Sequence, residues 1–186
     1  MRKLLIFGIF LLVCCNPYQP YLLTHYHMIA DIDPVSGIFD MNLQMVYVPR
    51  IQQKDSIEFH LDEAFSITSI GAQELVRYES YSGDRLVLYI QNPVIEGDQI
   101  HISMSYSGKP GAKFSPGEDL YIIDSILNWF PVNDDIPLMT CRLRIGLPEG
   151  YHLEGADVHK KLLNNYIVES REPVSSIRLA IYKNAK

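Results

Sequence analysis

The stretch HYHMIADIDPVSGIFDMNLQMVYV, residues 25–48, decides the fold of this chain. Apolar and polar residues alternate from Tyr26 to Asp33, and the alternation resumes from Phe39 to Tyr47. A period of two is typical of a β-strand that buries one face. Between the two halves, residues 33–37 (DPVSG) combine a proline that fixes φ with a glycine that tolerates positive φ. The stretch therefore predicts a long antiparallel hairpin.

The same alternation recurs further along the chain. Five more segments show it, each bounded by Gly, Pro, Asn or Asp: 57–61, 86–90, 100–106, 139–145 and 177–181. With the hairpin, this gives seven predicted strands, and three further strands are possible. No apolar stripe at helical spacing persists for three turns, so few helices are expected. Residues 108–117 and 128–137 break the rhythm and are predicted to be long loops. The sequence thus predicts a single all-β domain, an antiparallel curved sheet or β-sandwich.

The first fifteen residues, Met1–Cys15, have the layout of an export signal. Arg2 and Lys3 precede ten residues without a charge, a run too short to span a bilayer permanently. The end of this segment, LVCC (residues 12–15), resembles the lipobox of bacterial lipoproteins, with Cys15 as the acylated residue. Cys14 departs from the usual small residue, so ordinary secretion with two incidental cysteines stays open, as does which cysteine is acylated. Residues 16–24 form a tether to a domain over residues 25–186.

Charge and cysteine content exclude several classes of protein. The chain carries 16 Lys and Arg against 22 Asp and Glu. Removal of the signal leaves 14 against 22, a net charge of −8. No basic run exceeds two residues, which argues against a nucleic-acid partner. Cys141 is the only cysteine after Cys15, so no disulfide framework forms; its phase with Met139 and Leu143 predicts a buried core thiol.

Four pieces in this order resemble the N-terminal β-domain of aminopeptidase N-like zinc metallopeptidases: the hairpin, the run ending at Gly108, the loop Trp129-Phe130-Pro131 and the strand 140–148. In that family a Phe-Pro-x-x-Asp-x-Pro segment precedes a strand that ends in proline. Phe130, Pro131 and Asp134 match it, Pro137 comes one residue late, and Trp129 is similar to the more distant bacterial members. The resemblance covers nearly all of the exported chain and implies a saddle-like all-β domain.

The resemblance does not extend to the chemistry of the family. Its zinc site needs His-Glu-x-x-His, and its substrate amine is held by Gly-x-Met-Glu-Asn; neither motif occurs here, and the chain stops about where the catalytic domain would begin. The Gln or Glu that the N-terminal domain lends to the substrate has no clear match in Leu120–Asp124. We therefore predict no catalytic residue, no metal ligand and no cofactor in this chain.

Other candidate sites have ordinary structural alternatives. His25 and His27 share a strand face and could form half of a zinc site, but the spacing indicates no third ligand, and solvent-facing histidines are the alternative. Asp31 and Asp33 resemble the start of a calcium loop, without the ligands that should follow. The adjacent acids 62–63, 118–119 and 134–135 do not show two carboxylates held across a cleft.

The loop formed by Trp129, Phe130, Pro131 and Asp134 is the predicted partner-contact segment, because exposed aromatic residues contribute strongly to binding. The alternative is that the two rings close one end of the core.

These observations lead to two main functional hypotheses. The first is a non-catalytic binding or scaffold lipoprotein of the cell envelope, anchored in the membrane and facing the periplasm or exterior, with an envelope protein or a peptidase domain as partner. The second is an accessory or split fragment of a zinc aminopeptidase whose catalytic domain is on another chain. A hydrolase that uses loop carboxylates is a third, weaker hypothesis.

Overall fold

The computed structural model describes residues 23–50, 55–72, 75–81, 83–110, 120–124, 127–136, 138–154, 158–170 and 172–184. The export segment with Cys15, most of the tether, the acids 118–119 and Pro137 lie outside these residues. The predictions made for them stay predictions.

The described residues form thirteen strands. The seven predicted strands are all present, as β1 (Thr24–Asp33), β2 (Ile38–Tyr47), β3 (Ser56–His60), β6 (Arg85–Ile90), β7 (Ile100–Gly108), β9 (Met139–Gly146) and β13 (Arg178–Lys183). Six more were not counted among them: β4 (Phe65–Ala72), β5 (Leu75–Tyr81), β8 (Leu120–Asp124), β10 (Tyr151–Glu154), β11 (Val158–Leu162) and β12 (Asn165–Glu169).

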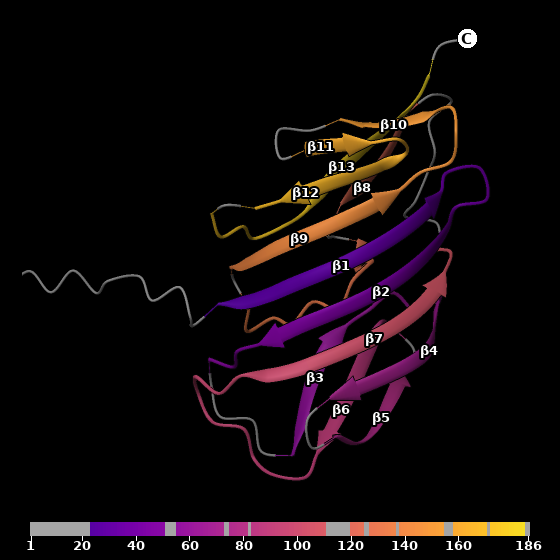
Figure 1. Cartoon of the computed structure of the whole chain (residues 1–186). Coiled ribbons are helices and arrows are strands. Elements are labelled where there is room, and N and C mark those ends of the chain that lie inside the picture. Colours follow the sequence, from indigo (N-terminus) through magenta and orange to yellow (C-terminus); the bar gives the residue numbers. More distant parts are fainter. Residues whose placement is uncertain are drawn as a thin grey trace, which may run out of the picture.

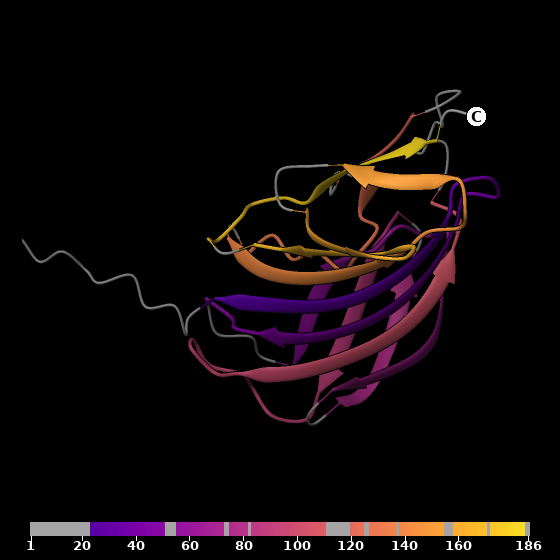
Figure 2. The same ribbon diagram turned by 45° about the horizontal axis from the view of Figure 1, so that its top comes forward.

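One large sheet of seven strands, in the order β11-β12-β9-β1-β2-β7-β4, forms the body of the molecule (Figure 1). Its neighbours are antiparallel except for β1 and β9, which run parallel over eight residue pairs from Thr24↔Met139 to Asp31↔Gly146. Two three-stranded antiparallel sheets, β3-β6-β5 and β10-β13-β8, complete the fold. The large sheet is visibly curved in Figure 2, with the small sheets behind it and at its upper end.

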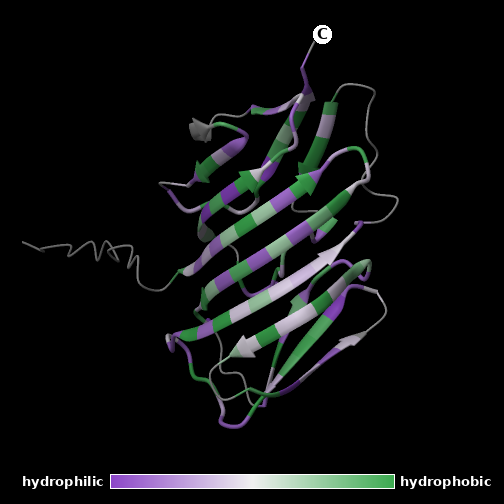
Figure 3. Cartoon of the chain, turned by 45° about the vertical axis from the view of Figure 1, so that its right-hand side comes forward, coloured by the Kyte–Doolittle hydropathy of each residue, from purple (hydrophilic) through white to green (hydrophobic). Residues whose placement is uncertain are grey.

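The large sheet has one buried and one open face. Along β1 the residues alternate strictly between buried and exposed from Thr24 to Asp31, and β2, β7 and β9 follow the same period. Figure 3 shows the matching alternation of hydrophobic and hydrophilic residues along these strands. The inward set, which includes Met28, Leu43 and Leu143, packs into the core shared with the small sheets. We call the outward side of this sheet the open face.

Tyrosine side chains join the large sheet to the small ones, through one ring contact and one hydrogen bond. Tyr47 of β2 meets Phe59 of β3 edge to face, with ring centroids 5.4 Å apart. At the other end, the buried Tyr166 hydroxyl of β12 donates to the Tyr151 carbonyl of β10 at 3.4 Å. Edge-to-face pairs add roughly 0.5–1.5 kcal/mol beyond the area that they bury. These contacts hold both small sheets against the same face of the large sheet.

The predicted all-β fold with a curved sheet is confirmed, with one difference in strand direction. Between β1 and β9 the chain forms β2, β4 and β7 of the large sheet and β3, β5, β6 and β8 of the two small sheets. It then returns to pair β9 in parallel with β1, and parallel neighbours require such a crossover. Among the described residues, no helix has the length and apolarity needed to span a bilayer.

Candidate functional site

The loop predicted to contact a partner lies between β8 and β9, and its aromatic residues are in the core. Trp129 and Phe130 are both 0% exposed, and their rings meet edge to face at 4.9 Å. Pro131 is buried as well, whereas the Asp134 side chain is 89% exposed. The alternative left open by the sequence, that the two rings close the core, is the arrangement seen. Only the polar end of the loop, around Asp134, faces outward.

Two tyrosines of the large sheet fix this loop through its backbone. The Tyr26 hydroxyl of β1 donates to the Pro131 carbonyl at 2.9 Å, and the Tyr106 hydroxyl of β7 donates to the Trp129 carbonyl at 3.2 Å. Both hydroxyls are buried, and burial raises the pKa of Tyr26 and of Tyr106 above the usual range. Both therefore stay protonated and keep donating at any physiological pH.

A small charged cluster holds the outer end of the loop. His60 of β3 lies 3.2 Å from Asp84 through Nδ1 and 3.5 Å from Asp134 through Nε2. Asn128 Nδ2 donates to the other Asp84 oxygen at 2.5 Å. The hydrogen bond to Asp84, followed by the charge of Asp134, raises the pKa of His60 against the opposing effect of burial. The cluster links β3, the turn before β6 and the loop, so its role in this fold is structural.

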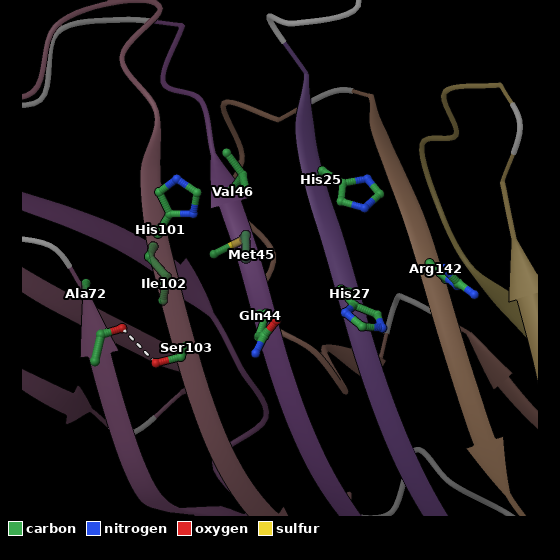
Figure 4. Close-up of a pocket in the computed structure, with 11 residues that line it drawn as sticks. His25, His27, Gln44, Met45, Val46, Ala72, His101, Ile102, Ser103 and Arg142 are labelled. Atoms are coloured by element: carbon green, nitrogen blue, oxygen red, sulfur yellow. Dashed lines mark hydrogen bonds between the residues drawn. The ribbon is translucent and has the colours of Figure 1, made fainter.

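A hollow lies on the open face, across the ends of β9, β1, β2, β7 and β4, and we call it the histidine groove. It has a volume of about 640 Å³. The polar side chains that line it are His25, His27, Gln44, His101, Ser103 and Arg142. In Figure 4, His25 and His27 project from β1, and His101 and Ser103 project from β7.

Register brings these residues into two rows. One row runs across the sheet from Arg142 through His27 and Gln44 to Ser103. The next row joins His25 through Val46 to His101. The sequence identified only His25 and His27 of this set. The alternation did imply an outward position for Arg142 and His101, but nothing local showed that their strands flank β1 and β2.

The structure gives the histidine pair no third metal ligand. His25 Nδ1 lies 2.7 Å from the Thr140 hydroxyl, and no group of three or more His, Cys, Asp or Glu in the described part of the chain could hold a metal ion. Asp33 instead accepts hydrogen bonds from the Val35 amide and the Ser36 hydroxyl, which is a turn rather than a calcium loop.

Cys141 is 3% exposed and is a free thiol, so the prediction of a buried core cysteine is confirmed. It lies on the inward face of β9, between Met139 and Leu143.

Strand β8, the segment Leu120–Asp124, is an edge of the β10-β13-β8 sheet. On the outer side of that sheet, Ile122 is 41% exposed and is paired with Ala180 of β13. The neighbouring pair Leu120 and Tyr182 shares this side, and both residues are half-buried. The outer side of this sheet combines these apolar side chains with Glu154 and with His152, whose ring stacks on that of Tyr182.

No family model and no curated protein matches the chain. Among solved structures, an M1 zinc metallopeptidase from Deinococcus radiodurans is similar at 14% identity with a TM-score of 0.71. A mutant of the M1 enzyme from the same organism, bound to a Tyr-Ser-Ala substrate, is similar at 15% identity with a TM-score of 0.68. In both cases the likeness covers 86% of this chain and 42% of the peptidase chain.

These matches define the class of the fold. The chain has the β-domain architecture found within M1 zinc metallopeptidases, so the resemblance inferred from the sequence is confirmed at the level of the fold. The chain spans less than half the length of the peptidases that it resembles. Neither His-Glu-x-x-His nor Gly-x-Met-Glu-Asn occurs in the sequence.

Proposed function

We propose that this chain is a non-catalytic binding or scaffold protein of the cell envelope that reuses the aminopeptidase β-domain without its enzyme. One observation supports this most strongly: nearly the whole described chain corresponds to less than half of a zinc peptidase, and neither zinc-peptidase motif occurs in the sequence. The buried aromatic loop supports a structural role for the matching Phe-Pro segment.

The proposal includes a lipid anchor at Cys15. The apolar segment before it and the polar tether after it are the layout that acylation requires, and a multiply acylated cysteine anchors a protein stably where one chain alone does not. Mass spectrometry of the mature N-terminus tests this directly. We expect a diacylated or triacylated Cys15; an uncleaved signal or an unacylated start would refute the anchor.

The absence of peptidase activity is tested separately. The purified chain is assayed on aminoacyl p-nitroanilides, with and without added zinc. We expect no turnover above a heat-denatured control. Turnover that zinc stimulates and a chelator abolishes would contradict the non-catalytic role.

The alternative is an accessory chain that completes a zinc aminopeptidase encoded separately. The exposed Ile122 on the outer side of the β10-β13-β8 sheet favours it, because a second domain would cover this apolar side chain. Reading the genomic DNA beyond the codon for Lys186 distinguishes the two. A neighbouring frame that encodes His-Glu-x-x-His would favour the accessory chain over the scaffold.

A further inference from the structure

The histidine groove is unusual for the sign of its charges. Every ionisable side chain that lines it is basic: His25, His27, His101 and Arg142. The whole chain is acidic, with a formal net charge of −6. A local basic hollow in an acidic protein concentrates positive potential where a ligand can approach.

The donors in this groove are largely uncommitted. Among the described residues, the side chains of His27, His101 and Arg142 make no hydrogen bond or ion pair within the chain. Gln44 adds an amide, and the Ser103 hydroxyl has only a long contact of 3.5 Å to the Gly71 carbonyl (Figure 4). Exposed imidazole and guanidinium groups with free N–H bonds are suited to phosphate and carboxylate oxygens.

The spacing of the basic groups sets the size of the ligand. His27 and Arg142 are direct neighbours on β1 and β9, about 5 Å apart between strands. His25 and His101 are separated by β2, which gives roughly 10 Å. A single small anion would reach His27 and Arg142 only, whereas a ligand with two or more anionic groups would also reach His25 or His101. The volume of about 640 Å³ lies within the usual range for small-molecule sites.

We propose that the histidine groove binds a small polyanion, a molecule with at least two phosphate or carboxylate groups, and that it binds most tightly in mildly acidic solution.

The pH dependence follows from the groups that face one another across the groove. β1 supplies His25 and His27, β7 supplies His101, β9 supplies Arg142, and the lining residues of β2 and β4 carry no charge. Glu169 of β12 is paired with Arg142 on the far side from β1, and its charge acts on His25. Burial and the neighbouring His27 lower the pKa of His25, against a smaller opposing effect of Glu169.

An imidazole ring can accept a second proton in mildly acidic solution, whereas a guanidinium group does not lose its charge in proteins. The groove therefore gains positive charge as the pH falls from about 8 to about 5.5.

The test is an NMR titration of the chain as recovered from the expressing cells, in mild detergent. Sodium pyrophosphate and sodium citrate serve as the phosphate and carboxylate probes, at constant ionic strength of about 0.15 M. At pH 6, saturable shifts are expected for the ring signals of His25, His27 and His101, with a dissociation constant below about 1 mM. His60 and His152, which lie outside the groove, are the internal controls and should not shift. Binding of only one probe supports the proposal and assigns the anionic group.

Three variants make the test specific. His27→Gln and His101→Gln should each weaken binding by about tenfold or more, since each removes a charged donor. Arg144→Gln is the matched control, because Arg144 is an exposed cation on the same face of β9 but does not line the groove. It should weaken binding by less than about threefold at this ionic strength.

Three results would overturn the proposal. One is the absence of saturable binding of both probes up to about 10 mM at pH 6. Another is an equal effect of Arg144→Gln and His27→Gln, which would mean a diffuse response to surface charge. The third is unchanged affinity at pH 8. None of these outcomes depends on whether the chain is a scaffold or a peptidase accessory.

Discussion

Replacing Tyr26 with phenylalanine removes one buried hydroxyl and leaves the ring in place. In the native chain that hydroxyl donates to the Pro131 carbonyl at 2.9 Å, across 105 residues of sequence. Tyr26 is 1% exposed and Pro131 is buried, so water cannot readily replace the lost donor. An unsatisfied buried acceptor costs about 1–3 kcal/mol. For a domain of this size each kcal/mol lowers Tm by about 2–4 °C, so the expected fall is about 2–12 °C.

The assay is equilibrium unfolding in urea, followed by the emission of Trp129. This residue is the only tryptophan of the chain and lies in the loop that Tyr26 fixes, so its fluorescence reports the affected region. Tyr106→Phe removes the companion bond to the Trp129 carbonyl, and its longer distance of 3.2 Å predicts a smaller loss. Tyr78→Phe is the matched control, because Tyr78 is 39% exposed. Its effect should stay within about 0.5 kcal/mol.

The reasoning is refuted if Tyr26→Phe unfolds within about 0.5 kcal/mol of the native chain, as the control does. That result would mean that the loop carbonyl finds another donor, or that the loop is held by its aromatic rings alone. The double variant separates these explanations. Additive losses indicate two independent clamps, while a smaller combined loss indicates that releasing one carbonyl already frees the loop.

Three further outcomes are expected. The pKa of His60 is raised, first by its hydrogen bond with Asp84, so protonated His60 stabilises the fold. This stabilisation is complete below about pH 6.5 and is lost as the pH rises through the folded-state pKa. Urea midpoints measured from about pH 5.5 to 8.5 should therefore fall, and His60→Gln should remove that part of the fall. Gly108→Ala should destabilise by about 1–3 kcal/mol in thermal unfolding, since the new Cβ would overlap the backbone of Ala64, and an unchanged Tm would contradict the close approach. Cys141, at 3% exposure, should react with a thiol reagent only as fast as the chain unfolds; rapid labelling of its peptide under native conditions, read by mass mapping, would show that β9 opens locally.

The strands that the sequence missed have identifiable physical features. β4 contains a bulge between Ile67 and Ser69, which shifts the phase of its alternation halfway along. β11 and β12 are five residues each, and their pairing also contains a bulge. β8 has only five residues and is an edge strand. Short or bulged strands carry too few alternating positions to be distinguished from loops.

The candidate site residues also fall into two groups: those whose position follows from local alternation and those whose position depends on the order of the strands. The positions of His25 and His27 on a solvent face follow from local alternation, and the structure agrees. The partnership of His101 and Arg142 with them depends on strand order, which brings residues more than seventy positions apart into neighbouring rows. For Trp129 and Phe130 the sequence leaves both a surface contact and a place in the core open, because an aromatic pair beside a proline has no period to decide its side.

By itself the sequence determined that this chain is all-β, where seven of its strands lie, and which of their side chains face inward, because neighbouring residues show the period of two directly. The tertiary structure alone decided that β1 pairs in parallel with β9, that the Phe-Pro loop is clamped beneath the sheet, and that three histidines and an arginine meet in one groove. Those choices depend on which strands become neighbours, and that order is set by packing the whole core rather than by any local stretch of residues.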